Sequence, residues 1–495
     1  MYELLLVTMR ILIGMSKRKT GGRKMADSLQ KFVKPRLGLL GLMTDNYEQV
    51  FPGITERQEN FARKVADSLS EMVEIQFIGA GLNRKSIEKI VQQYNEMSLD
   101  GILVTLLTYS QGSWIVRALE ENHLPIAVAV IQQDRTVLDE WEELDLTVNQ
   151  GLHGAQDNCN AIMRMGIPCH FFAGEWESPR FKKFVLDFGK AAATVRFLRH
   201  MRVAVIGRMA GMNDVLTDDM AVLRKIGPEF VHESLGPIYR NMEEVSSREI
   251  EDRIHRDYEI FDVDPKLSHE SHAYAARFYL GIRKFLEDYK FDAFTIHFDE
   301  VSFDGRFKQL PLLAASHLMA EGYGYAAEGD VLCASMVAAA HCLGSRDANF
   351  TEMYTMDFDK QAIIFCHAGE GNWSTHRTDM RPKLIDRFLG EGGLENPPTP
   401  IFTPRVGEAT LTSLASVEGG HFRLVMAKGS ILPKSDLRRC EMPYFFWRPD
   451  VGIERCVEGW IASGGTHHEV INLGDITERW KMLADYLGIE CRFIE

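Results

Sequence analysis

Short apolar runs alternate with amphipathic helical stretches along the first part of the chain. The runs RLGLLGLM (36–43), VEIQFIGA (73–80), GILVTLL (101–107) and PIAVAVI (125–131) are short and almost uninterrupted by polar residues, as in strands buried on both faces of a parallel sheet. Residues 54–72 between the first two runs have helical periodicity. This alternation predicts a doubly wound, Rossmann-like α/β domain.

A second unit of the same kind begins at MRVAVIGR (201–208) and continues through FDAFTIHFDE (291–300), interpreted as a strand that ends in acidic residues. After about residue 348 the pattern changes to short, turn-rich strands such as residues 409–432, and a helix near residues 475–487 closes the chain. We therefore predict an α/β protein with two Rossmann-like doubly wound parallel sheets followed by a C-terminal antiparallel β domain, barrel or sandwich. The expected divisions are residues 36–200, 201–348 and 349–495.

Length, charge and cysteine usage limit the number of domains and the classes of partner that the protein can have. The 495 residues suit about three domains, and a formal charge of −14 argues against a nucleic acid or an anionic membrane and favours a small polar substrate. Eight scattered cysteines without a CxxC pair suit reduced thiols in the cytoplasm. The apolar run at residues 4–15 is too short to span a bilayer, so residues 1–35 are expected to be a disordered or dispensable extension.

Carboxylates and imidazoles stand at the ends of several predicted strands. Taken singly, each has a simple structural explanation: an acidic residue among small neighbours suits an exposed turn, and a lone histidine is commonly a core or surface residue. Taken together, two carboxylates and two imidazoles would form a mixed oxygen and nitrogen shell for Mn²⁺, Co²⁺ or another divalent ion. The candidates are Asp299 or Glu300, Glu328 in YGYAAEGD, His367, and the pair His467 and His468.

The loop GRMAGMND (207–214) follows the first strand of the second sheet. It lacks the GxGxxG spacing of a dinucleotide site, and the simplest interpretation is a strand-to-helix loop. Ligands of open α/β sheets bind at this edge, however. We therefore keep Arg208, Met209, Met212 and Asp214 as candidate walls of a pocket.

The run FDAFTIHFDE…KQLPLLAASHLMAEGYGYAAEGD resembles the central signature of the L-arabinose isomerase family, in which an acidic strand end leads to KQLP, a helix and GYGFAGEGD. The resemblance extends to residues 146–158, 271–291 and 356–370 and to the GGTHH run, and it covers nearly the whole chain from about residue 36. It implies a Mn²⁺-type ion held by Asp299 or Glu300, Glu328, His367 and His468. It also implies a homo-oligomer, a hexamer with sites at subunit contacts.

The activity implied is aldose–ketose isomerisation through an enediolate, with Glu328 as a base and Asp299 or Glu300 opposite it. We expect substrate contacts from Gln150, His153, Met212 and His467. The order Phe298-Asp299-Glu300 replaces the family's Phe-Glu-Asp. Neighbouring strand residues face opposite sides, so only one of the two carboxylates can face the metal if the strand stays regular. Direct register with the family favours Asp299, whereas the extra residues within SFDGRF (302–307) could re-aim Glu300.

The chain also departs from the family in its substrate-binding segments. The N-terminal loop is GLMTDNYEQVFPG (41–53), and residues 129–134 lack an expected pocket histidine. Retained metal residues with altered substrate residues suggest the same chemistry on a pentose or related sugar, or an inactive sugar-binding homologue. A metal-dependent aldolase or hydrolase could use the same ligands.

Overall fold

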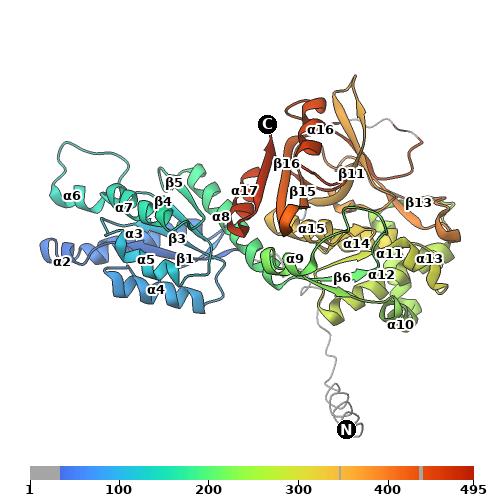
Figure 1. Ribbon diagram of the computed structural model, residues 1–495, viewed down its shortest axis with the longest axis horizontal. Helices are drawn as coiled ribbons and strands as arrows, with labels where there is room; N and C mark the ends of the chain where they lie inside the picture. The colour runs from blue at the N-terminus through green and yellow to red at the C-terminus, as the bar shows by residue number, and fades with distance from the viewer. Residues whose placement is uncertain (1–33, 345–346, 434–436, 438) are drawn as a thin grey trace, which may run out of the picture. The chain divides into compact units, whose positions relative to one another are not determined.

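The computed structural model describes residues 34–344, 347–433, 437 and 439–495, and residues 34–495 form one compact unit. The predicted extension, residues 1–35, lies outside the described part apart from Lys34 and Pro35. Five parallel strands form the first sheet, in the order β2-β1-β3-β4-β5 (Figure 1). They are β1 Arg36–Leu42, β2 Glu74–Gln76, β3 Gly101–Leu106, β4 Ile126–Val130 and β5 Cys169–Ala173.

Helices accompany this sheet as the alternating pattern predicts. The longer ones carry apolar residues at helical spacing; in α3, for example, Phe61, Val65 and Leu69 are buried. The helices are α2 Asn46–Val50, α3 Ile54–Leu69, α4 Arg84–Glu96, α5 Ser113–Glu120, α6 Glu143–Val148, α7 Gly151–Arg164 and α8 Pro179–His200.

The second sheet has four parallel strands in the order β10-β9-β6-β7. The strands are β6 Arg202–Ile206, β7 Glu229–His232, β9 Ala293–Ile296 and β10 Gly324–Ala327. The helices of this part are α9 Asp219–Lys225, α10 Gly236–Glu244, α11 Ser247–Ile260, α12 His269–Tyr289, α13 Phe298–Asp304, α14 Leu312–Ala320 and α15 Val331–Leu343. α15 is buried along its whole length, which explains its continuous apolar sequence.

A mainly antiparallel sheet with the strand order β15-β18-β11-β12-β17-β16 follows, and pairing of β15 with β16 closes it into a barrel. Its strands are β11 Ala348–Asp357, β12 Ala362–Cys366, β15 Gly407–Val417, β16 His421–Ile431, β17 Tyr444–Pro449 and β18 His468–Leu473, with β19 Glu490–Ile494 added in parallel to β16. Helix α16 Ile453–Ala462 and helix α17 Thr477–Leu487 accompany the barrel, together with the 3-10 turns η2 Trp373–Thr375, η3 Glu391–Gly393 and η4 Glu418–Gly420.

Two features connect the parts of the chain. A small sheet pairs β8 Asp262–Val263 with β13 Lys383–Asp386, which pairs in turn with β14 Pro398–Ile401. Helix α17 packs against α8, where Arg479 Nε donates to Asp187 Oδ1 at 2.7 Å, and the Tyr486 hydroxyl donates to the Ile126 carbonyl at 2.8 Å. Within the described ranges, none of the helices combines the length and apolar character needed to cross a bilayer.

The predicted fold class, parallel α/β sheets followed by an antiparallel β domain, is confirmed. The division at residues 200 and 348 stays a prediction. One element was assigned wrongly: β9 ends at Ile296, and helix α13 begins at Phe298. Asp299 and Glu300 therefore lie in the first turn of a helix, so the argument from strand alternation does not apply to them.

Candidate functional site

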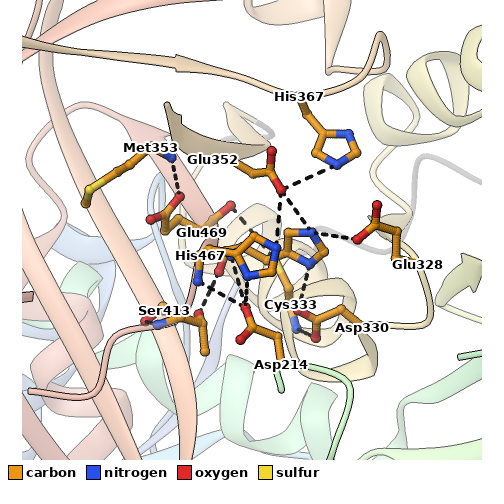
Figure 2. A network of polar contacts seen from close by, with 12 residues as sticks. Asp214, Glu328, Asp330, Cys333, Glu352, Met353, His367, Ser413, His467 and Glu469 are labelled. Atoms are coloured by element: carbon orange, nitrogen blue, oxygen red, sulfur yellow. Dashed lines mark hydrogen bonds and ion pairs between the residues drawn. The ribbon is translucent and has the colours of Figure 1, made fainter. Parts of the chain in front are cut away.

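Four side chains from the second sheet and the barrel converge at one place. Glu328 follows β10, Glu352 lies on β11, His367 follows β12, and His468 is the first residue of β18. In the barrel, Glu352 pairs with His468 on one side and with Cys366, the neighbour of His367, on the other. This register brings the two imidazoles to the same carboxylate, and Figure 2 shows the Glu328 side chain facing them. We call these four residues the histidine–glutamate cluster.

The distances fit a cation among the four head groups. Glu352 Oε1 lies 3.2 Å from His468 Nε2 and 3.7 Å from His367 Nε2, and Glu328 Oε2 lies 3.6 Å from His468 Nε2. The three residues Glu352, His367 and His468 can offer ligand atoms to a single ion. The buried His468 Nε2 faces the carboxylates of Glu352 and Glu328. Buried nitrogen and oxygen atoms that face one another in this way suit a divalent ion.

The remaining nitrogen of each histidine lies beside a buried carboxylate. Asp330 Oδ2 lies 3.0 Å from His468 Nδ1, and Glu370 Oε1 lies 3.1 Å from His367 Nδ1. The Tyr325 hydroxyl donates to the same Glu370 oxygen at 3.0 Å. Carboxylates in this position orient metal-binding imidazoles and leave Nε2 for the ion.

The charges of the cluster also favour a cation. Burial lowers the pKa of His468, but the hydrogen bonds and charges of Asp330 and Glu352 outweigh burial and raise it to about 10. Burial raises the pKa of Glu352, yet His468, His367 and His467 lower it overall. The carboxylates that favour a positive charge on His468 would also attract a divalent ion.

Glu328 adopts a backbone conformation that residues other than glycine rarely adopt. Its φ is 66°, and its carbonyl accepts from Met209 N at 2.8 Å. The next residue must be glycine, because a Cβ on Gly329 would lie 2.4 Å from Arg208 Cα. Strained residues of this kind concentrate at functional sites. The small residues around Glu328 allow the backbone to turn so that the Glu328 carboxylate faces the cluster.

A second group adjoins the cluster. Asp214 Oδ2 accepts from the backbone amides of His467 and His468 at 3.0 and 3.2 Å and lies 2.8 Å from His467 Nδ1. Burial raises the pKa of Asp214, but His467 and His468 lower it overall. His467 Nε2 is 3.5 Å from Glu352 Oε1, so this predicted substrate residue borders the cluster. Met212 lies two residues from Asp214 and is partly buried.

Asp299 and Glu300 belong to neither candidate ligand group among the described residues. Glu300 is exposed and packs near Gly207, where an added Cβ would lie 2.5 Å from Glu300 Cγ. Glu352, which the sequence pattern did not single out, is the carboxylate that groups with His367 and His468. In the sequence, Glu352 is one acidic residue within ANFTEMYT, and its pairing with Cys366 and His468 is seen only in the structure.

Gln150 and His153 lie elsewhere, at the carboxyl end of the first sheet. His153 is exposed and stacks on Tyr109, with ring centroids 4.9 Å apart. Gln150 Nε2 is buried without a hydrogen-bond partner in the described part of the chain, as is Ser110 Oγ. Unsatisfied buried polar atoms at this edge suit a polar ligand, but no contact between described residues connects Gln150 or His153 with the histidine–glutamate cluster.

The family models and the curated relatives that match this chain all belong to one family. The L-arabinose isomerase central domain matches residues 209–346, and the L-arabinose isomerase C-terminal domain matches residues 347–490. The L-arabinose isomerase of Geobacillus thermodenitrificans is 27% identical over 406 residues, covering 79% of this chain and 80% of the relative. L-arabinose isomerase 1 of Bacillus licheniformis is 26% identical over 449 residues, covering 88% and 90%. The Nocardioides L-arabinose isomerase is 28% identical over 412 residues, covering 80% of each chain.

Proposed function

Because the chain belongs to the L-arabinose isomerase family, we propose that it is an aldose–ketose isomerase that acts on a pentose or related sugar at the histidine–glutamate cluster. The observation that carries the proposal is the convergence of Glu328, Glu352, His367 and His468. The relatives named above are L-arabinose isomerases, so L-arabinose is the first sugar to test.

The four residues of the cluster would hold Mn²⁺ or Co²⁺. When bound, such an ion supplies positive charge for neighbouring substrate oxygens and for the enediolate that develops between C1 and C2. Asp330 and Glu370 keep the two imidazoles in the orientation that presents Nε2. Asp299 or Glu300 remains the competing ligand proposal, which the variants below separate from Glu352.

Two carboxylates of the cluster, Glu328 and Glu352, are the groups that would transfer the proton. Glu328 and Glu352 are 20% and 14% exposed, so each carboxylate is buried enough to exclude bulk water and open enough to meet a sugar. One carboxylate removes the proton from C2, next to the carbonyl carbon, and returns it to C1, while the hydroxyl proton of O2 moves to O1. Glu328 is our first choice as this base, because its carboxylate approaches from the opposite sheet.

We also propose that the chain acts as a cytoplasmic homo-oligomer, with a hexamer implied by the resemblance. All eight cysteines are free of disulfide bonds, which suits a reducing compartment. Light scattering coupled to size-exclusion chromatography would give the number of subunits.

The proposal is tested by comparing Glu352→Gln with Asp299→Asn and Glu300→Gln. We expect Glu352→Gln to weaken Mn²⁺ binding by at least about 100-fold and to remove isomerase activity, because a charged ligand is lost. Calorimetric titration measures binding, and ketose formation from a panel of aldoses measures activity.

Asp299→Asn and Glu300→Gln, the two variants in helix α13, are matched controls because each also removes one carboxylate. Each should bind Mn²⁺ within about threefold of wild type, since neither carboxylate belongs to the cluster. Loss of binding in Asp299→Asn or Glu300→Gln, with normal binding in Glu352→Gln, would reverse the ligand assignment. Cleavage products in place of a ketose would indicate an aldolase or hydrolase.

A further inference from the structure

A buried carboxyl group lies directly behind the histidine–glutamate cluster. Glu469 follows His468 on β18, and successive strand residues face opposite sides. His468 faces the cluster, whereas Glu469 shares its face with Ile471, which belongs to the apolar core of the barrel with Leu411 and Trp447. Glu469 is only 1% exposed, and an acid in an apolar core is costly unless it makes a compensating hydrogen bond.

A backbone amide of the neighbouring strand β11 faces the Glu469 carboxyl group. The carboxyl accepts one hydrogen bond that is visible in Figure 2, from Met353 N to Glu469 Oε2 at 3.1 Å. The partner of this acid is therefore the backbone of the residue that follows Glu352.

Strand pairing explains why Met353 needs that acceptor. Glu352 and His468 form the last pair between β11 and β18, so β18 offers no further ladder partner as β11 continues to Asp357. On its other side β11 has a register shift against β12, between Met353 and Thr355. A bulge frees backbone groups and re-aims neighbouring side chains, and the Glu469 carboxyl replaces the missing ladder acceptor at this point.

We infer that Glu469 is a positioning residue that fixes the backbone after Glu352 and so aims the Glu352 carboxylate at the cluster. The inference rests on the proposed function in one respect, that Glu352 is a metal ligand. This role explains why Glu469 lies in the apolar core of the barrel: it supports the histidine–glutamate cluster, which lies on the opposite face of β18.

The test compares Glu469→Val and Glu469→Leu, which remove the acceptor, with Glu469→Gln, whose amide oxygen can accept the same hydrogen bond. We expect the apolar variants to weaken Mn²⁺ binding about tenfold, and Glu469→Gln to stay within about twofold of wild type. The melting temperature of the metal-free apolar variants should be unchanged or higher, because a buried acid is replaced by an apolar side chain.

Ile471→Val is the control for packing on the same face. It should lower the melting temperature and leave the Kd for Mn²⁺ unchanged. A purely structural role for Glu469 would instead give all variants a loss of melting temperature without a selective change in Kd. That pattern would overturn the inference.

Hydrogen exchange tests the inference without metal. In the peptide that contains residues 350–356, the apolar variants should exchange faster than wild type, and Glu469→Gln should exchange like wild type. Unchanged exchange in the apolar variants would contradict the role of Glu469, whatever the metal affinity. Absence of Mn²⁺ binding by wild type would instead contradict the proposed function, and the exchange result would still decide the role of Glu469.

Discussion

At the scale of single residues, Glu328 combines a site carboxylate with an unfavourable backbone conformation. A left-handed conformation costs a non-glycine residue about 1 to 2 kcal/mol, and asparagine tolerates it better than glutamate. The Glu328 carboxylate lies 3.6 Å from His468 Nε2, too far for a hydrogen bond that would offset this cost. The backbone conformation therefore disfavours glutamate at this position, and its presence serves the site.

We therefore predict that metal-free Glu328→Asn is at least as stable as wild type, with a gain of up to about 1 kcal/mol in the free energy of unfolding. In saturating Mn²⁺ the order should reverse, because the variant loses the stabilisation that ligand binding gives to the native state. Urea unfolding with and without Mn²⁺ measures both values. A metal-free variant less stable than wild type by more than about 1 kcal/mol would show that Glu328 stabilises the fold.

The sequence led to three of the four cluster residues and missed the fourth for a physical reason. Glu328, His367 and His468 stand at the ends of apolar runs whose direction can be inferred from the pattern. The position of Glu352 depends on a hairpin between β11 and β12 and on pairing with β18, more than 100 residues away. The periodicity of apolar residues does not show which residues of distant strands pair with each other. It also does not show that a helix starts at Phe298, since a short apolar run has no internal mark of where a strand ends.

At the scale of elements, a buried ion network joins α11, α12 and α14. Asp257 is fully buried, and its oxygens lie 2.8 Å from Arg253 Nη2, 2.9 Å from His272 Nε2 and 3.0 Å from His317 Nε2. Trp373 Nε1 donates to His317 Nδ1 at 3.1 Å, which connects the network with the loop that carries His367. Burial raises the pKa of Asp257, but His317, His272 and Arg253 lower it overall.

Asp257→Asn should destabilise the protein by about 3 to 5 kcal/mol at pH 7, because the buried Arg253 guanidinium loses its counter-charge and two buried histidines lose a charged hydrogen-bond partner. The pKa of Asp257 is depressed in the folded state, so its contribution is present above the unfolded pKa of about 4 and is lost as the pH falls below it. The difference between variant and wild type should accordingly shrink below about pH 4. Urea unfolding across this range measures it.

Asp252→Asn is the control on the same helix. Asp252 is exposed and pairs loosely with Arg248, at 3.8 Å. Its loss should change stability by less than about 0.5 kcal/mol at every pH. An equal effect of both substitutions would contradict the special role of the buried network.

At the scale of the whole molecule, the sequence predicted the succession of sheets but not their closure. Alternation of strands and helices is a local pattern, and it was sufficient for the two parallel sheets. Closure of the barrel depends on pairing of β15 with β16 and of β15 with β18. Apolar alternation alone left a barrel and a sandwich as equal interpretations, because both bury one face of each strand.

Removal of residues 1–33 should leave this architecture intact. Residues 34–495 form a compact unit of their own, and β1 is anchored at its start by the hydrogen bond from Arg36 N to Asp100 Oδ2 at 2.7 Å. We expect the melting temperature of the shortened protein to stay within about 2 °C of the full chain. A calorimetric scan of both proteins measures this, and a drop of many degrees would show that the extension contributes to the fold.

The contacts of helix α17 with α8 and β4 set an order of events during synthesis. Asp187 meets Arg479 across 292 residues, and Ile126 meets Tyr486 across 360 residues. At about 5 to 20 residues per second, a ribosome needs roughly 15 to 60 s to make the chain between Asp187 and Arg479. During that interval the nascent first domain lacks its C-terminal cover, and its apolar surface is available to chaperones until the last helix emerges.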